Sequence, residues 1–411
     1  MNTISRSPLE NKEGVLQALV EEIRISEHAD GLARDRYDAL GRWLDRPNST
    51  LHGLQPVIYP QGSFLLGTAI RPVGDGDAYD VDLVVVLENA SPWRFTQASL
   101  KELVGKEIKA YAKEKGLKAE PERKRRCWTL EYADAARFHL DILPALPASR
   151  DQIVQKLGLE GTRLFEANRG SLDKTVIAIT DENENGFHDP RSQWPLSNPK
   201  GFGEWFRLTQ EGYLKEHIDS GSLLRDGRAK AEVEYVPLHE VLTPLQATIM
   251  LLKRHRDAMF DGDDDKPISV IITTLAGEAY RGARSIEATL SQVLPAMRLR
   301  IANLEPDAQI LNPSLPNENF ADKWGETPRK RSHFETWIEQ ANQDFLGYLS
   351  ENGLRPSPGL EARITKTTMD KIVARLPFSA SPVSRLPAAA RNEAEKVKAD
   401  GRQTRPWFSK Q

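Results

Sequence analysis

Two aspartates one residue apart, Asp80 and Asp82, are the residues of this sequence best suited to carry chemistry. They stand in residues 79–87, YDVDLVVVL, whose β-branched side chains predict a strand. Residues two apart in a strand share one face, so the two carboxylates project together. Such neighbours repel one another unless a cation lies between them, and Mg²⁺ prefers oxygen ligands. Taken alone, the pair is explained more often by calcium binding or a strand-end turn than by a magnesium site.

Two further features indicate a site that handles phosphates. Gly62 and Ser63 precede the pair, and a glycine lets a phosphate approach the backbone while Ser63 offers a hydroxyl and an N–H at a predicted helix start. Asp141 lies in a second apolar strand, residues 137–143, which we expect beside the first. Three carboxylates supply about three negative charges to two divalent cations roughly 3.5–4 Å apart, the arrangement for in-line nucleotidyl or phosphoryl transfer.

The elements that must position these residues are predicted from periodicity and from turn residues. Ser7 and Pro8 have the form of a helix start, and apolar residues recur at helical spacing to about Asp45. This pattern predicts one long helix, or two that are interrupted at Gly31. Strands are predicted at residues 56–59, 79–87, 126–132 and 137–143, and an amphipathic helix at residues 97–116.

From about residue 150 the sequence becomes helical. We expect Pro144 and Pro147 to end the strand that carries Asp141, because proline cannot donate to a ladder. Further helices are predicted at residues 238–260 (chiefly after Thr243), 268–281 and 334–351. The segment after residue 379 is rich in Pro, Ala, Ser and Lys, so we expect it to be mobile or to depend on a partner.

Composition narrows the functional class. The net charge of −3 argues against a chain-wide electrostatic grip on long nucleic acid. A single cysteine, Cys127, excludes an internal disulfide framework and favours a reducing compartment. The N-terminus lacks the apolar region of a signal peptide, and no apolar run approaches the roughly 20 residues of a membrane span. We therefore expect a cytoplasmic protein.

The ordered set of motifs resembles a known family. Gly62-Ser63, Asp80-Val81-Asp82 and residues 139–145, HLDILPA, are similar to the polymerase-β-type nucleotidyltransferase signature. More narrowly, they resemble the CD-NTases, the cGAS/DncV-like enzymes of bacterial CBASS anti-phage systems. Segments at residues 197–201, 251–256, 267–275 and 312–324 extend the likeness over residues 10 to 350.

The resemblance implies a bilobed α/β (α+β) fold with a long N-terminal helix. Residues 1–50 would pack across both lobes, and residues 51–195 would form a mixed-sheet catalytic lobe. Residues 196–378 would form a helical nucleotide-binding lobe, followed by a tail at 379–411.

The resemblance also implies roles for single residues in metal and phosphate binding. Asp80, Asp82 and Asp141 would bind two Mg²⁺ ions, with Mn²⁺ as a substitute. Gly62 and Ser63 would hold the β- and γ-phosphates.

Residues of the helical lobe are implied by matching position. Lys253 would reach the phosphates and Ser269 would donate a hydroxyl at a helix start. The alternatives are a solvated helix lysine and a plain N-cap. Ser197 and Asn198 would lie near the bases, the alternative being a turn before Pro199.

Two neighbouring features receive no catalytic role. The basic run at residues 123–126 could widen the positive field at the cleft, although an exposed edge explains it more simply. His139 is not assigned as a base or a metal ligand, because we expect it on the strand face opposite to Asp141.

The hypothesis from sequence is a Mg²⁺-dependent nucleotidyltransferase that makes a cyclic di- or trinucleotide second messenger from NTPs, ATP included, with release of pyrophosphate, in anti-phage defence. A linear oligonucleotide or RNA-tailing transferase and an inactive nucleotide-binding regulator are the alternatives. The expected partners are NTPs and regulatory or C-terminus-binding proteins of a CBASS operon. Neither a membrane nor long nucleic acid is required.

Overall fold

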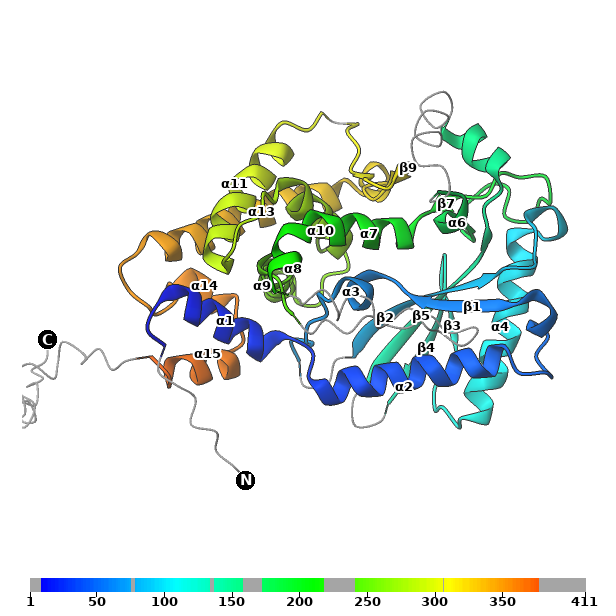
Figure 1. The fold of residues 1–411 in the computed structure, drawn as a ribbon, viewed down its shortest axis with the longest axis horizontal. Helices are drawn as coiled ribbons and strands as arrows, with labels where there is room; N and C mark the ends of the chain where they lie inside the picture. The colour runs from blue at the N-terminus through cyan, green and yellow to red at the C-terminus, as the bar shows by residue number, and fades with distance from the viewer. Residues whose placement is uncertain are drawn as a thin grey trace, which may run out of the picture.

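A seven-stranded mixed sheet forms the centre of one lobe, in a computed structural model that describes residues 9–74, 78–133, 137–157, 172–217, 241–305 and 307–376 (Figure 1). Its strands are β1 (Pro56–Pro60), β2 (Tyr79–Leu87), β3 (Glu122–Arg123), β4 (Trp128–Tyr132), β5 (Phe138–Pro147), β6 (Ile177–Ile179) and β7 (Leu196–Ser197). The order is β1-β2-β5-β4-β3, and β6 and then β7 extend the sheet from the later part of β5. Only β2 and β5 pair in parallel. The predicted strand at 79–87 is confirmed.

One face of this sheet is covered and the other faces the second lobe. Val81, Leu83 and Val85 of β2 belong to a core that also contains residues of α2 (Glu27–Leu44) and α4 (Gln97–Glu114). Val84 and Val86 point to the other side, into a small separate cluster with Leu143 and Ala145. Because side chains alternate along a strand, Asp80 and Asp82 lie on the same side as that small cluster.

The N-terminal helical region is two helices, and the break differs from both predictions. α1 (Lys12–Ile23) ends before Arg24, and α2 begins after its N-cap Ser26, so Gly31 lies inside α2. Residues of α1 are in the core of the helical lobe, whereas those of α2 pack on the sheet. The chain therefore breaks where it passes from one lobe to the other. Asn11 caps α1, and the predicted start at Ser7 and Pro8 lies outside the described residues.

The second lobe is helical and is built around α9 (Pro244–Met259), which is buried on all sides from Pro244 to Arg256. α1, α10 (Ser269–Ala279), α11 (Ile286–Ala302) and α13 (Pro328–Ser350) pack against it. The other helices of this part of the chain are α7 (Pro199–Thr209), α8 (Glu211–His217), α12 (Lys323–Glu326), α14 (Pro358–Ala362) and α15 (Lys366–Val373). The remaining elements are α3 (Gly62–Leu66), α6 (Leu172–Thr175), the turns η1 (His52–Leu54) and η2 (Pro92–Arg94), and a hairpin of β8 (Leu311–Asn312) and β9 (Leu315–Asn319). No described helix is long and apolar enough to cross a membrane.

The prediction that Pro144 ends its strand is wrong. β5 runs on to Pro147 and stays paired with β2 through Pro144 and Ala145. On the opposite side, pairing with β4 stops at Ile142 and pairing with β6 starts at Ala145. Pro144 stands in that gap, where a missing N–H interrupts no ladder to β4 or β6.

Two glycines in helices of the sheet lobe give a matched test of this packing. A Cβ added to Gly105 of α4 would meet the buried Trp128 ring at 2.4 Å, whereas one added to Gly31 of α2 meets nothing within 4 Å. Gly105→Ala should lower the free energy of unfolding by about 1–3 kcal/mol through overpacking. Gly31→Ala should raise it by about 0.4–1 kcal/mol, because alanine favours a helix. Urea denaturation measures both, and a Gly105→Ala protein as stable as the wild type would contradict the packing.

Candidate active site

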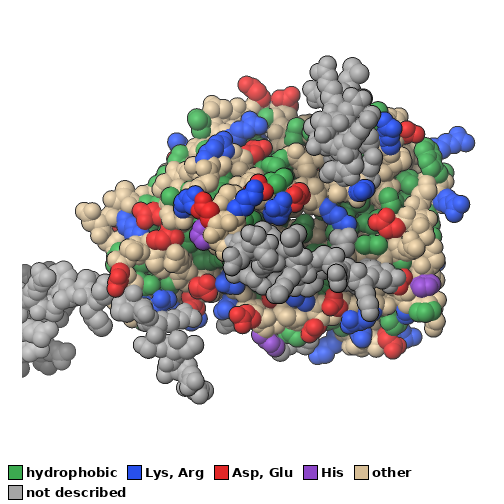
Figure 2. All heavy atoms as spheres, in the orientation of Figure 1, with side chains coloured by type: hydrophobic (Ala, Val, Ile, Leu, Met, Phe, Trp, Pro, Cys, Tyr) green, Lys and Arg blue, Asp and Glu red, His purple; other side chains and the backbone are tan. Residues whose placement is uncertain are grey.

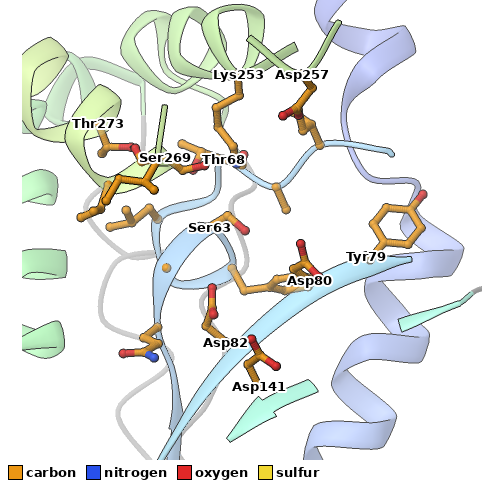
Figure 3. A pocket seen from close by; sticks show the side chains of 18 of the residues that line it. Ser63, Thr68, Tyr79, Asp80, Asp82, Asp141, Lys253, Asp257, Ser269 and Thr273 are labelled. Atoms are coloured by element: carbon orange, nitrogen blue, oxygen red, sulfur yellow. Dashed lines mark hydrogen bonds between the residues drawn. The ribbon is translucent and has the colours of Figure 1, made fainter. Parts of the chain in front are cut away.

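The three aspartates come together because of the register between β2 and β5. Asp82 pairs directly with Asp141, and Asp80 pairs with His139. Neighbouring strands lie about 4.8 Å apart, so these side chains share one small area of the sheet. Figure 3 shows Asp80, Asp82 and Asp141 on the strands, with Ser63 above them and Lys253 and Ser269 coming from the opposite lobe.

Asp82 is the most constrained of the three. Burial, together with the charges of Asp141 and Asp80, raises its pKa from 3.8 to about 7, although Lys253 and Lys124 act in the opposite direction. The folded protein therefore places an ionised Asp82 at an unfavourable position. A divalent cation beside it would offset both the cost of burying an ionised carboxylate and the repulsion by its neighbours.

Asp141 and Asp80 have different surroundings. Thr129 donates its hydroxyl proton to Asp141, and Lys124 Nζ lies 3.5 Å from the same carboxylate oxygen. The Asp80 side chain is 79% exposed and lies 3.5 Å from His139 Nδ1. The prediction that His139 faces away from Asp141 is wrong, because residues two apart in a strand share a face and His139 lines the same cavity.

Gly62 lets α3 begin directly over Asp82. Its φ of +59° is in the left-handed region, and a Cβ there would lie 2.5 Å from Asp82 Oδ2. The main-chain N–H of Gln61 donates to the Asp82 carbonyl at 2.9 Å, which fixes the approach of the loop to the strand. Ser63 follows in the first turn of α3, and both Gly62 and Ser63 line the cavity.

Side chains of α9 hold the segment that follows Ser63. Gln246 donates to the Leu66 carbonyl at 2.9 Å, Lys253 Nζ to the Thr68 carbonyl at 2.8 Å, and Arg254 to the Arg71 carbonyl. Lys253 is therefore buried and bonded to the backbone, not a solvated lysine. Burial, and next the charge of Arg256, lowers its pKa to about 8.

Ser269 is the first residue of α10 and lines the cavity. Its hydroxyl accepts from Arg256 Nη1 at 2.8 Å, and Arg256 also donates to the Pro267 carbonyl. Its side chain does not cap α10, because Ile268 is the N-cap residue.

Ser197 and Asn198 separate in the structure. Ser197 lines the cavity and donates to Glu318 at 2.5 Å. Asn198 is 1% exposed and caps α7, because its Oδ1 accepts from the Gly201 N–H at 3.0 Å. This contact agrees with the alternative reading from sequence, a turn before Pro199, and not with a side chain that faces a base.

Most of the basic run at residues 123–126 is engaged in ion pairs. Arg125 and Arg126 contact the fully buried Asp181 at 2.6 and 2.7 Å, and Arg126 also contacts Asp322 at 2.9 Å. Within the run, Lys124 is the residue that contacts a catalytic candidate, Asp141. Neither a plain exposed edge nor a general positive field describes this arrangement.

A cavity of about 1120 Å³ lies between the lobes, and it is lined by Gly62, Ser63, Asp80, Asp82, Asp141, Ser197, Lys253 and Ser269. Figure 2 shows Lys and Arg side chains on both sides of the hollow on this face. Among the described residues, no three His, Cys, Asp or Glu side chains stand close enough in these positions to enclose a metal ion. The donor set still fits a hard divalent cation, because three carboxylates line one wall and because burial and the neighbouring charges both disfavour an ionised Asp82. The missing Cβ of Gly62 makes room for the Asp82 carboxylate beneath the loop.

Glu318, Lys124 and Thr129 lie at the site, although the sequence alone assigned none of them an individual role. Glu318 lies 121 residues from its partner Ser197, and burial raises its pKa. Thr129 could have been found only from the register of β4 on β5, which pairs it with Asp141.

Comparison with known proteins agrees with this geometry. The model of the family described as "Cyclic GMP-AMP synthase DncV-like, nucleotidyltransferase domain" matches residues 56–144, which contain all three aspartates. A c-di-GMP synthase of Roseivirga ehrenbergii is 27% identical over 348 residues, 83% of this chain and 81% of that protein. The cyclic dinucleotide synthase CdnG of Bradyrhizobium diazoefficiens is 29% identical over 334 residues, 78% of this chain and 72% of that protein.

Solved structures share the fold. The B. diazoefficiens CD-NTase CdnG in complex with GTP aligns with a TM-score of 0.60 and 21% identity, over 89% of this chain and 99% of that chain. A mutant of the Vibrio cholerae dinucleotide cyclase DncV, in complex with ATP, GTP and a further ligand, aligns with a TM-score of 0.55 and 14% identity, over 86% and 95% of the two chains. Residues 56–144 therefore match a DncV-like nucleotidyltransferase domain, and over most of its length the chain is similar to cyclic dinucleotide synthases of the CD-NTase group, whose fold it shares.

Proposed function

We propose that this chain joins NTPs, ATP among them, into a cyclic di- or trinucleotide second messenger and releases pyrophosphate, and that it does so in anti-phage defence. The observation that carries the proposal is the pairing of Asp82 with Asp141, with Asp80 on the same face and the Gly62–Ser63 turn directly above. The names of the two relatives, a c-di-GMP synthase and a cyclic dinucleotide synthase, support a cyclic product.

The carboxylates would hold two Mg²⁺ ions, or Mn²⁺ in their place. Bound there, the ions would lower the pKa of the attacking ribose hydroxyl and offset the charge of the departing pyrophosphate. Asp80 is exposed enough to turn toward Asp82 when a nucleotide arrives. Asp141, which accepts a hydrogen bond from Thr129, would face the hydroxyl that attacks the α-phosphorus.

The loop and the helical lobe would bind the triphosphate. Backbone N–H groups and the hydroxyl at Gly62 and Ser63 suit the β- and γ-phosphates. Lys253 would exchange the Thr68 carbonyl for a phosphate oxygen, a stronger, charge-assisted partner. Ser269 stands on the same wall of the cavity and offers a hydroxyl.

The size of the cavity supports two substrates at once. Its volume of about 1120 Å³ exceeds the roughly 300–1,000 Å³ of pockets for one drug-sized ligand. A linear intermediate therefore has room to turn over, so that its second end reaches the carboxylates and the ring closes. Regulation by partner proteins also belongs to the proposal, and a related structure is a CdnC:HORMA complex of Escherichia coli MS115-1.

Replacing the carboxylates tests the chemistry. Asp82→Asn and Asp141→Asn should each lower the rate of pyrophosphate release from NTPs by at least about 100-fold, because each removes a charge fixed at the reacting phosphate. Asp35→Asn, at an exposed position of α2, is the control and should leave the rate unchanged. Release at the parent rate by folded Asp82→Asn protein would contradict the assignment.

Thermal stability tests metal binding without turnover. Because the pKa of Asp82 is raised in the folded state, stability is lost as the pH rises from 3.8 to about 7. Asp82→Asn should therefore raise Tm by about 2 °C or more at pH 8, with a smaller gain toward pH 4. Mg²⁺ should raise the Tm of the wild type at pH 8 and leave that of Asp82→Asn nearly unchanged. An equal response of the two proteins to Mg²⁺ would exclude Asp82 as a ligand.

The product distinguishes ring closure from chain growth. We expect incubation with all four NTPs and Mg²⁺ to give a small product that survives phosphatase, identified by mass spectrometry, because a ring has no terminal phosphate. Removal of the metal with EDTA should abolish it. Phosphatase-sensitive chains would favour the linear transferase, and no turnover of any NTP would favour the inactive regulator.

A further inference from the structure

One end of the cavity has aromatic walls and a fixed set of hydrogen-bond acceptors. Phe202 and Phe320 both line the cavity, with ring centroids 5.5 Å apart in an edge-to-face arrangement. Ser197 and Glu318 line the same cavity and supply its polar groups at this end. An apolar wall with a few convergent polar groups is the usual form of a base-binding pocket.

The hydroxyl proton of Ser197 is already used in a hydrogen bond within the protein. It donates to Glu318 Oε1 at 2.5 Å, so only its lone pairs remain for a ligand. Ser197 lies in β7 and is 7% exposed, which limits rotation to other partners. This oxygen therefore meets a ligand as an acceptor.

Glu318 is held by donors from three directions. Besides Ser197, the main-chain N–H of Asn198 and the Asn312 amide donate to its Oε2, at 3.2 and 2.6 Å. Asn312 in turn accepts from the N–H and the hydroxyl of Ser314, both at 2.8 Å, and this fixes which end of its amide faces Glu318. Three bonds leave the carboxylate with capacity for one more donor, on Oε1.

Two adjacent acceptors distinguish among the bases. On its Watson–Crick edge guanine carries an N–H and an amino group side by side, which are two donors. Adenine offers one amino donor beside an acceptor nitrogen, and cytosine likewise. Uracil offers one N–H between two carbonyls. An acceptor ring nitrogen facing Glu318 would leave a buried carboxylate opposed by a lone pair, which disfavours binding strongly.

We propose that this end of the cavity selects guanine, with Ser197 Oγ and Glu318 accepting the two donors of its Watson–Crick edge. The inference deepens the proposed function and rests on it. Glu318 has a second role as a positioning residue, since it decides that Ser197 meets the base as an acceptor. Burial raises the pKa of Glu318, and the N–H groups of guanine would favour its ionised form.

Binding of uncleavable nucleotides tests the proposal apart from turnover. α,β-Methylene analogues of GTP and ATP cannot release pyrophosphate, so calorimetry with Mg²⁺ measures the Kd of each for the full chain. The wild type should bind the guanine analogue at least about 10-fold more tightly, as expected when a buried acceptor would otherwise lack its donor. Inosine triphosphate, which lacks the amino group, should compete more weakly than GTP.

Two substitutions should remove the preference. Glu318→Gln lets Ser197 accept from the new amide and turn its own proton to the ligand, and Ser197→Ala deletes one acceptor. In both, the ratio of the two Kd values should fall below about 3, mainly through weaker binding of the guanine analogue. Glu335→Gln, at an exposed position of α13, is the matched control and should keep the wild-type ratio. Melting temperatures show whether each variant folds. If Glu318→Gln does not fold, the ratio of Kd values measured for Ser197→Ala alone tests the proposal.

The outcomes separate the two proposals. Equal affinity of the wild type for the two analogues, or a ratio unchanged in folded Ser197→Ala, would overturn the guanine inference and leave the proposed function intact. If neither analogue binds, the proposed function fails first.

Discussion

The crowding of negative charge between β2 and β5 is the constraint on which the rest of the structure depends. A parallel register sets Asp82 opposite Asp141, and Asp80 follows on the same face one pleat away. Burial, together with the charges of Asp141 and Asp80, raises the pKa of Asp82 to about 7. Such an arrangement disfavours the ionised carboxylates in the free protein, and divalent cations would offset that cost. The three carboxylates line the cavity between the lobes, where a ligand can reach them.

Apolar packing on one face of the sheet offsets the electrostatic cost of the carboxylates on the other face. The face with Val81, Leu83 and Val85 is packed under α2 and α4 and supplies the stability of the lobe. On the opposite face, the carboxylates occupy the first part of the strands, and the small apolar cluster with Val84 and Val86 follows them. Alternation along one strand thus joins a rigid core to a reactive surface.

The helical lobe completes the site by holding the loop above the carboxylates. The buried helix α9 holds the segment after the Gly62–Ser63 turn through three hydrogen bonds. They are donated by Gln246, Lys253 and Arg254 to the carbonyls of Leu66, Thr68 and Arg71. Leu66 itself lies in the core of the helical lobe. The segment that follows the Gly62–Ser63 turn is therefore packed on the helical lobe, although the turn itself lies over the aspartates of the sheet.

Local patterns predicted the parts of this fold that have local causes. The strand at 79–87 follows from β-branched content, and the helix after Thr243 follows from helical apolar spacing with Pro244 in its first turn. The pairing of Asp141 with Asp82 needed more than periodicity, because a parallel partner is chosen by the whole sheet. The continuation of β5 through Pro144 depends on a gap between two neighbouring strands that a sequence does not display.

Long-range contacts account for what could not be predicted. Ser197 and Glu318 meet across 121 residues, and neither position alone has a spacing that indicates a bond. Arg125 and Arg126 form a charge run that is typical of an exposed edge, yet the buried Asp181 lies between them in space. His139 is different, because period-two alternation was enough to place it beside the aspartates.

The most direct measurement is a crystal structure with Mn²⁺ and an uncleavable NTP analogue, in which anomalous scattering locates the metal. Two anomalous peaks should lie roughly 3.5–4 Å apart, bounded by carboxylate oxygens of Asp80, Asp82 and Asp141 and by phosphate oxygens of the nucleotide. A nucleotide bound in the cavity with no anomalous peak beside Asp82 would contradict the account.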